Sequence, residues 1–299
     1  MSARTVSPAV VSMLGAQLGN QLFQYAAGRA LASARGSELL LHLPKGLDSS
    51  LFSGFSLNAR RWDDDDRDAH PFHAVLLRSS LLGRAARYAE RLRPIERRRW
   101  YENDGFNHDR RFSLLGGDIV LSGYWQSYKY FHHLRDHLRK ELRFVGPLSA
   151  AAQSVAGMID AHEEAVGIHV RRGAYVQEGW PLLSNDYFEK ALRMLVCTQG
   201  LSSPRLFVFS NDPAWCAAEM LPGRSTIIVS EMGTTACEDL ALMSRCRYLL
   251  ISPSTFSWWA AYLSESVRAV LAPYRWFFHN YEGFLHEDIY LPEWLIVRD

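Results

Sequence analysis

The chain has 299 residues, of which 48% are hydrophobic and 22% are charged, and its formal net charge is +1. Such values are typical of an ordinary globular protein with one large or two medium domains. The near-zero charge excludes the strong overall field that attracts nucleic acid. The first residues lack the apolar run of a signal peptide, and no stretch approaches the ~18 apolar residues of a membrane-spanning helix. The four cysteines lie outside CxxC or zinc-finger spacings. We therefore expect a cytoplasmic protein.

The first half of the chain is irregular. Val10–Leu14 and Glu38–Leu43 are predicted strands around a helix over Asn20–Ser33, whose apolar residues recur at a spacing of four. Farther on we expect a strand over Ile119–Trp125 and a helix over Lys129–Leu142. A basic helical piece is expected near Leu81–Leu92. The arginine-rich stretch from Arg84 to Arg99 is consistent with a solvated face or loop, or with peripheral contact to the anionic headgroups of a membrane.

The second half alternates regularly between strands and helices. Strands are predicted at Val166–Val170, Leu206–Phe209, Ile227–Val229, Tyr248–Ile251 and Ala269–Leu271, and helices at Asp186–Cys197, Pro213–Leu221, Ala236–Arg245 and Thr255–Leu263. This alternation indicates a doubly wound α/β domain, in which ligands bind beyond the carboxyl ends of the strands. Small residues cluster over Gly146–Ala165, so we place the boundary between two domains there, at 1–155 and 156–299.

Two adjacent arginines, Arg171 and Arg172, follow the strand that contains His169. Buried charges require partners, and the planar guanidinium matches phosphate oxygens. This segment is therefore either a binding site for a diphosphate or a structural ion pair with an acidic residue.

Three further segments lie between a predicted strand and a predicted helix. Ser252–Ser257 opens a helix, so its hydroxyls cap the helix or its N–H groups bind an anion. Asp212 either caps the next helix or accepts hydrogen bonds from a purine. Gly15 and Gly19 allow close approach of a ligand to the backbone, although their spacing is neither a Rossmann fingerprint nor a Walker loop.

No metal site is predicted from the sequence. There is no DxD between strands and no HExxH, and Asp63 to Asp66 form a continuous run. A serine hydrolase is not supported either, because no GxSxG elbow is present.

Seven ordered segments together resemble the α-1,2-fucosyltransferase family. They are GAQLGNQLFQYA at 15–26, SGYWQSYKYF at 122–131, HVRRGAY at 169–175, NDYFEK at 185–190, FVFSND at 207–212, the block EDLALMSRC…SPSTFSWWAAY at 238–262, and APYRWF at 272–277. The resemblance extends over about residues 10–295.

The resemblance implies an α/β fold of the GT-B type, with two Rossmann-like domains and the donor bound mainly by the C-terminal one. It implies inverting transfer of L-fucose from GDP-β-L-fucose to a galactose-containing glycan acceptor, without an essential metal or other cofactor. Carried over to this chain, Arg171 would hold the β-phosphate, and Arg172 would assist or brace the loop. The remaining donor-binding positions would be Gly19, Asn20, His169, Asp212, Ser254, Thr255, Phe256 and Ser257.

Two positions depart from the family pattern, because Ala174 replaces an aspartate and Pro253 replaces an asparagine. The general base is open between Glu178 and Asp186. Two alternatives stand beside an active fucosyltransferase, and Ala174 makes the first of them possible. One is a catalytically weak GDP-sugar-binding protein, and the other is a transferase that uses a different GDP-sugar.

Overall fold

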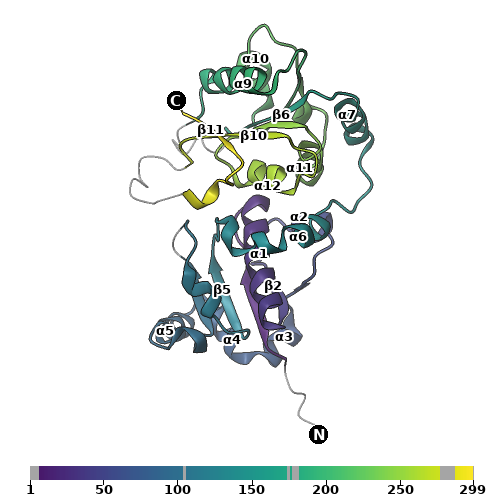
Figure 1. The fold of residues 1–299 in the computed structure, drawn as a ribbon. Helices are drawn as coiled ribbons and strands as arrows, with labels where there is room; N and C mark the ends of the chain where they lie inside the picture. Colours follow the sequence, from purple (N-terminus) through teal and green to yellow (C-terminus); the bar gives the residue numbers. More distant parts are fainter. Residues whose placement is uncertain (1–6, 104–105, 174–175, 177–181, 277–286, 299) are drawn as a thin grey trace. The chain divides into compact units, whose positions relative to one another are not determined.

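The computed structural model describes residues 7–103, 106–173, 176, 182–276 and 287–298 (Figure 1). The chain forms two compact units. Unit 1 contains the described residues up to Glu141 together with Glu287–Ile289, and unit 2 contains those from Leu142 to Trp276 together with Tyr290–Arg298. The division therefore lies at 141/142, whereas the sequence placed it at 155/156.

The sheet of unit 1 is parallel throughout and has the strand order β3-β2-β1-β5-β4 among the described residues. Its strands are β1 (Ala9–Met13), β2 (Glu38–His42), β3 (Arg60–Arg61), β4 (Trp100–Asn103) and β5 (Ile119–Gly123). The strands predicted at 10–14, 38–43 and 119–125 are present. The sequence did not predict β3 and β4, because each is short and neither carries a long apolar run.

Helices cover both faces of this sheet. They are α1 (Leu18–Arg35), α2 (Ser50–Gly54), α3 (Asp64–Ala69), α4 (Pro71–Leu76), α5 (Leu81–Arg91) and α6 (Arg135–Glu141), with 3-10 turns η1 (Ile95–Arg97), η2 (Arg110–Leu114), η3 (Tyr128–Tyr130), η4 (His132–Leu134) and η7 (Glu287–Ile289). Val11 of β1 packs with Leu76 of α4 in one apolar cluster. On the opposite face, a Cβ added to Gly28 of α1 would lie 3.0 Å from the Cβ of Ser12. Alternate side chains of β1 therefore point to opposite helix layers.

The sheet of unit 2 has the order β11-β10-β9-β6-β7-β8 within the described residues and is also parallel. Its strands are β6 (Ala165–Val170), β7 (Arg205–Ser210), β8 (Thr226–Ile228), β9 (Tyr248–Leu250), β10 (Ala269–Pro273) and β11 (Leu295–Val297). All five strands predicted in this half are present, and β11 was not predicted.

The helices of unit 2 are α7 (Ala150–Asp160), α9 (Asn185–Gln199), α10 (Pro213–Glu219), α11 (Ala236–Met243) and α12 (Thr255–Leu263), with a 3-10 turn η5 (Val229–Glu231). Helices α9 and α10 cover one face of the sheet, and α11 and α12 lie on the other (Figure 1). The segment read as a linker contains α7, which begins at the N-cap Ser149 and contacts α11. Its small residues resembled a linker, yet they allow close packing between helices.

Both units are thus parallel sheets with helices on both faces, so the predicted pair of Rossmann-like domains is confirmed. In unit 2, β6 pairs with β7 on one side and with β9 on the other, which gives the strand order 3-2-1-4-5-6 read from β8. The chain reverses its direction of winding between β6 and β9. Parallel sheets of this kind bind ligands beyond the carboxyl ends of the strands at that point.

Candidate active site

The two strongest motifs of the sequence meet where β6 and β9 separate in unit 2. Arg171 follows β6, and Ser252 follows β9 after one intervening residue. The hydroxyl of Ser252 donates a 2.6 Å hydrogen bond to the carbonyl oxygen of His169 and accepts one of 3.3 Å from the backbone N–H of Arg171. Ser252 is 1% exposed, so a single buried hydroxyl links the arginine loop to the loop that opens α12.

His169 lies beneath this link as a neutral imidazole. Its ring is buried and lies 5.6 Å from the ring of Phe256, centroid to centroid. Burial and, to a smaller extent, the charge of Arg171 lower the pKa of His169 to about 3. Its buried Nδ1 makes no hydrogen bond within the described structure. A buried imidazole that retains hydrogen-bonding capacity is compatible with a polar ligand group.

The start of α12 presents backbone donors at the same edge of the sheet. Ser254 is the N-cap residue, but its side chain makes no capping hydrogen bond. The hydroxyl of Ser257 donates to the carbonyl oxygens of Ser252 and Ser254 at 3.2 Å each. The Ser257 hydroxyl is therefore occupied by the loop itself. What this helix end can offer an anion is its first N–H groups, on Thr255, Phe256 and Ser257, which have no acceptor in a preceding turn.

Arg172 is fixed by the loop that follows β7. Its backbone N–H donates to Asn211 Oδ1 at 2.9 Å, its Nε lies 3.2 Å from Asp212 Oδ2, and its guanidinium carbon is 4.0 Å from the centroid of the Trp215 ring. The other carboxylate oxygen of Asp212 accepts from Trp215 N, as an N-cap of α10 does. Arg172 thus braces the loop.

The geometry also assigns contacts to Asp212 and Gly173 that bear on the sequence predictions. Both Asp212 oxygens are engaged, one by the N-terminus of α10 and one by Arg172, so the capping interpretation matches these contacts. Gly173 has φ +36°, and a Cβ there would lie 2.1 Å from Asn211 Nδ2. Only glycine fits this turn, which keeps the arginine loop close to the end of β7.

The NDYFEK segment at 185–190 contacts the loop that contains Ser252. Tyr187 of α9 is buried, and its hydroxyl donates a 2.9 Å hydrogen bond to the carbonyl oxygen of Ile251, next to Ser252. Asn185 Oδ1 accepts from the backbone N–H of Leu221. Asp186, one of the two candidate bases, is exposed in the first turn of α9. Glu178, the other, and Ala174 lie outside the described residues.

In unit 1 the first two motifs also meet at the carboxyl edge, between β1 and β5. Gln24 of α1 accepts from the backbone N–H of Gly15 at 2.8 Å and donates to the carbonyl oxygen of Gly123 at 3.1 Å. Gln126 donates to Asn20 Oδ1 at 2.9 Å. The glutamines of the two motifs thus join the loop after β1 to the loop after β5.

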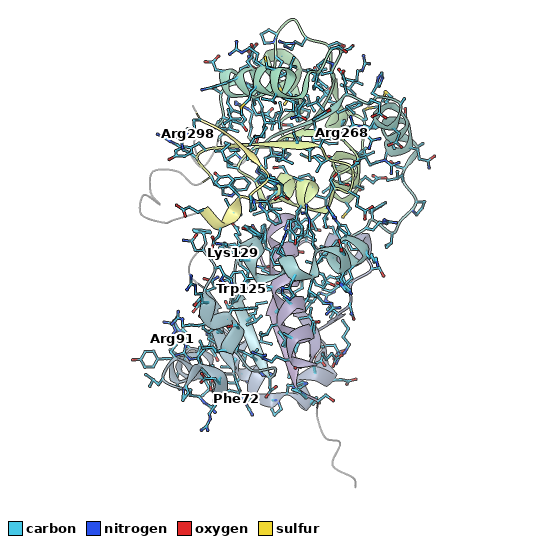
Figure 2. The ribbon with its side chains drawn as sticks, viewed as in Figure 1. Phe72, Arg91, Trp125, Lys129, Arg268 and Arg298 are labelled. Carbon is cyan, nitrogen blue, oxygen red and sulfur yellow. The ribbon has the colours of Figure 1, made fainter. Side chains whose placement is uncertain are left out.

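Gly123 allows two backbone segments to approach closely at this edge. Gly123 has φ +129°, and a Cβ there would lie 2.5 Å from the carbonyl oxygen of Asn103. Helix α1 starts at Leu18, whereas the sequence predicted a start at Asn20. Gly19, a predicted ligand contact, therefore belongs to the first turn of α1, and it is buried there. Trp125, with φ +57°, and Lys129 follow Gly123 at this edge (Figure 2). The nitrogen of Lys129 pairs with Asp288 of η7.

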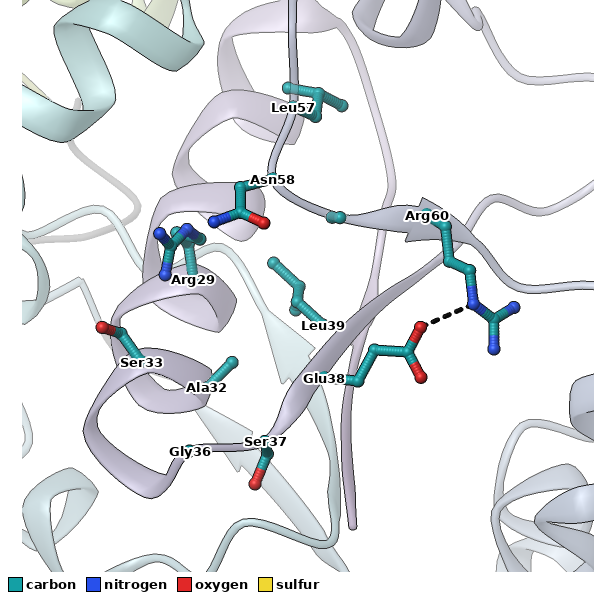
Figure 3. A pocket seen from close by; sticks show the side chains of 11 residues that line it. Arg29, Ala32, Ser33, Gly36, Ser37, Glu38, Leu39, Leu57, Asn58 and Arg60 are labelled. Carbon is teal, nitrogen blue, oxygen red and sulfur yellow. Dashed lines mark hydrogen bonds and ion pairs between the residues drawn. The ribbon is translucent and has the colours of Figure 1, made fainter. Parts of the chain in front are cut away.

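A hollow of about 440 Å³ in unit 1 lies away from both motifs. It is lined by Ser33 and Gly36 at the end of α1, by Asn58, and by the ion pair of Glu38 with Arg60, whose Nε–Oε1 distance is 2.6 Å (Figure 3). Glu38 begins β2, so this hollow adjoins the amino end of that strand. Ligands of parallel sheets bind at the opposite ends, and we assign the hollow no role in the site.

The motifs lie mainly at strand ends, and the family to which they belong is shown by a match over most of the chain. Residues 106–298 match glycosyl transferase family 11. This chain belongs to that family. The resemblance inferred from the seven segments is therefore confirmed, and the family match spans most of unit 2 and the last part of unit 1.

Named relatives cover nearly the whole of this family 11 chain. An alpha-1,2-colitosyltransferase of Escherichia coli is 28% identical over 276 residues, which cover 90% of this chain and 92% of the relative. Galactoside 2-alpha-L-fucosyltransferase Sec1 of Mus musculus is 29% identical over 293 residues, covering 93% and 71%. A mutant of Arabidopsis thaliana FUT1, solved in complex with GDP, shares the fold at 13% identity, with a TM-score of 0.53, over 90% of this chain and 70% of that one.

For several residues of the edge, the sequence did not show which groups they contact. Ser252, Asn211, Trp215 and Gln24 act by joining segments that are far apart in the chain. Gln24 lies within the segment at 15–26, but nothing in a single sequence shows which distant backbone group a glutamine binds.

Proposed function

We propose that this protein transfers L-fucose from GDP-β-L-fucose, with inversion, to O-2 of a galactoside in a glycan acceptor. The observation that carries the proposal is the Ser252 hydroxyl, which holds the Arg171 loop and the loop opening α12 together at the switch point of the unit 2 sheet. An arginine and a helix N-terminus at one such edge supply two independent sources of positive potential for a diphosphate.

The reaction requires charge stabilisation at both ends of the breaking bond. Cleavage of the bond between fucose C1 and the β-phosphate oxygen leaves GDP with an additional negative charge and gives the sugar carbon oxocarbenium character. Arg171 and the first N–H groups of α12 would stabilise the leaving diphosphate without reorganisation. Arg172, braced by Asp212 and Trp215, would act as a positioning residue for the Arg171 loop. The neutral His169 would contact the donor without adding charge.

The acceptor hydroxyl must lose a proton as it attacks C1. Glu178 and Asp186 stay the candidate bases. Asp186 is exposed in the first turn of α9. Unit 1, with the linked Gly15 and Gly123 loops, would supply acceptor binding, and unit 2 the GDP site.

A second donor is favoured by one specific observation, the similarity to an alpha-1,2-colitosyltransferase of Escherichia coli over 90% of this chain. A donor panel separates the candidates. Purified protein is incubated with galactosides and either GDP-fucose or GDP-colitose, and released GDP and transferred sugar are both measured. Transfer from GDP-fucose supports the proposal. Transfer from GDP-colitose alone would show that the donor is GDP-colitose and not GDP-fucose. Binding of either donor without transfer would support the weak GDP-sugar-binding alternative.

A further inference from the structure

The amino edge of the unit 1 sheet carries a cluster that the transfer reaction does not use. His70 precedes α4, His73 lies within it, and Asp118 immediately precedes β5. One ligand atom from each of the three lies within 4.8 Å of the others. Strand β5 separates Asp118 from the Gly123 loop by roughly 16 Å at ~3.3 Å per residue. The cluster therefore lies far from the carboxyl edge of the same sheet.

His73 is the unexplained member of this cluster. Its ring is 2% exposed, and its Nδ1 makes no hydrogen bond within the described structure. Nε2 of His73 lies 3.4 Å from Asp118 Oδ1. A neutral imidazole has one N–H and one lone pair, and leaving one ring nitrogen without a hydrogen bond in a buried site is costly. Such a ring is expected when a group absent from the protein chain completes it.

One neighbouring side chain holds the carboxylate of the cluster. Arg99 Nε lies 3.5 Å from Asp118 Oδ2, on the other oxygen from the one that faces His73. Arg99 would orient the Asp118 carboxylate, in the way that side chains hydrogen-bonded to metal ligands hold those ligands in place. The rings of His70 and His73 lie 5.4 Å apart, as their i, i+3 spacing allows.

We propose that His70, His73 and Asp118 bind one divalent transition-metal ion of the Zn²⁺ type, with water in the remaining position. Two imidazoles and one carboxylate form a ligand set that Zn²⁺ accepts, at about 2.0–2.2 Å from each atom. The three ligand atoms lie within 4.8 Å of one another. Small movements of the half-buried His70 and Asp118 side chains would bring them to bonding distance from one ion. The ion would link the α3–α4 segment to the start of β5 and would raise the stability of unit 1.

The test uses the full chain and Zn²⁺ alone. Metal analysis of the purified protein identifies any bound ion, calorimetry measures stoichiometry, and thermal unfolding measures stabilisation. We expect one equivalent of Zn²⁺ and a rise in Tm of about 5 °C at a hundredfold excess over Kd. Co²⁺ should give the visible absorption of a tetrahedral site. His70→Gln and Asp118→Asn should lose both responses, while exposed His133→Gln in the same unit should keep them.

A lack of stoichiometric binding, or binding that survives in both His70→Gln and Asp118→Asn, would overturn the metal site. Fucosyl transfer is a separate readout, because the cluster is remote from the carboxyl edge. Loss of Zn²⁺ binding with fucosyl transfer intact therefore overturns the metal site alone, and loss of transfer with Zn²⁺ binding intact overturns the proposed function alone.

An independent feature of unit 1 is an apolar stripe on α5. Leu81, Ala85, Tyr88 and Leu92 recur at i, i+4, i+7 and i+11, and Leu82 adjoins them. The exposed fractions of Leu81, Leu82, Tyr88 and Leu92 are 77%, 62%, 66% and 76%. Buried Gly83 and Glu90 lie on the opposite side of the helix, so α5 faces the unit with one side and presents leucines with the other. Such a stripe is unusual on a free surface.

Positive charge adjoins this stripe on one side, although several arginines of the segment are engaged within unit 1. Residues 78–99 contain eight arginines and two glutamates. Arg84 is exposed beside the stripe, and Arg91, 55% exposed, lies at the periphery of the unit, paired with Glu102 (Figure 2). Among the described residues, none of the helices is long and apolar enough to cross a bilayer. A helix with an apolar face bordered by arginines has the composition of one that lies in a membrane interface.

We also propose that α5 docks on an anionic lipid surface. Phosphatidylcholine vesicles with and without phosphatidylglycerol are sedimented with the full chain. We expect binding only to the anionic vesicles and weaker binding at high salt. Leu81→Ser with Leu92→Ser should lower the partition coefficient by about tenfold or more. Leu114→Ser, another exposed leucine of unit 1, is the matched control.

Two results would overturn the membrane surface. One is equal binding by the leucine variant and the protein without substitutions. The other is a dimer in solution that the same two substitutions dissociate, because the stripe would then be covered by a second copy of the chain.

Discussion

The hydroxyl of Ser252 donates a 2.6 Å hydrogen bond to the carbonyl oxygen of His169, across 83 residues of sequence. It also accepts from Arg171 N, so this one side chain determines where the arginine loop leaves the sheet. We expect Ser252→Ala to cost about 1–3 kcal/mol of stability, because a buried carbonyl loses its donor. Displacement of the loop should reduce kcat/KM roughly tenfold. Ser264→Ala removes another buried hydroxyl of unit 2 and should lower stability without the loss of activity. Unchanged kcat/KM in folded Ser252→Ala would show that the bond does not place Arg171.

Arg171→Lys should be severely impaired although the charge is retained. Lysine cannot reproduce the forked contact that a guanidinium makes with two phosphate oxygens. Loss of a preorganised contact at the leaving group costs ~2.7–4 kcal/mol, which is roughly a hundredfold to a thousandfold in rate. Steady-state release of GDP measures the effect, and exposed Arg193→Lys in α9 serves as the control. A near-normal rate for Arg171→Lys would locate the phosphate site elsewhere.

Transfer should not require an added divalent metal ion. Arg171 and the start of α12 provide the positive potential that a metal supplies in other transferases. Activity measured in EDTA, well below the unfolding temperature, should match activity with Mg²⁺ or Mn²⁺. Loss in EDTA that only these ions restore would contradict the metal-independent mechanism. A fall in Tm in EDTA with the rate unchanged would instead report on the His70 cluster.

His169 should make the protein less stable in acid. Burial lowers its pKa to about 3 in the folded state, whereas the unfolded chain titrates near 6.5. Between these values the unfolded state binds the extra proton, so stability is full above pH 6.5 and falls as the pH decreases. In His169→Asn, the loss of unfolding free energy between pH 7 and pH 5 should be smaller by up to about 2 kcal/mol. Denaturant unfolding at both pH values measures it, and an equal loss in both proteins would show that His169 is not buried neutral.

Ala174→Asp tests the departure from the family motif. A carboxylate at this position would pair with an arginine of the same loop and set its rotamer. Arg172 is already held by Asp212 and Trp215, so we expect the added aspartate to change kcat/KM little, or to reduce it by competing with phosphate. A large gain in kcat/KM for GDP-fucose would mean that the natural site is weakened, and would favour the weak-binding alternative.

Local sequence was sufficient to predict much of this protein. The apolar runs from Val166 to Leu271 predicted five strands and four helices of unit 2, because buried parallel strands are continuous apolar segments separated by helical periodicity. The seven motifs predicted the family. The same reasoning failed where a segment is short or made of small residues, as for β4 and for α7, whose alanines and glycine resemble a linker.

Only the tertiary structure determined which groups meet. Arg172 and Asp212 are 40 residues apart, and their pairing depends on β6 lying beside β7. His73 and Asp118 come together because α4 packs beside β5, so no local pattern predicted that cluster. For α5, helical periodicity alone gives a stripe of leucines that a core helix would also show. Whether such a stripe is buried depends on which side of the helix the rest of the chain covers, and in unit 1 it covers the opposite one.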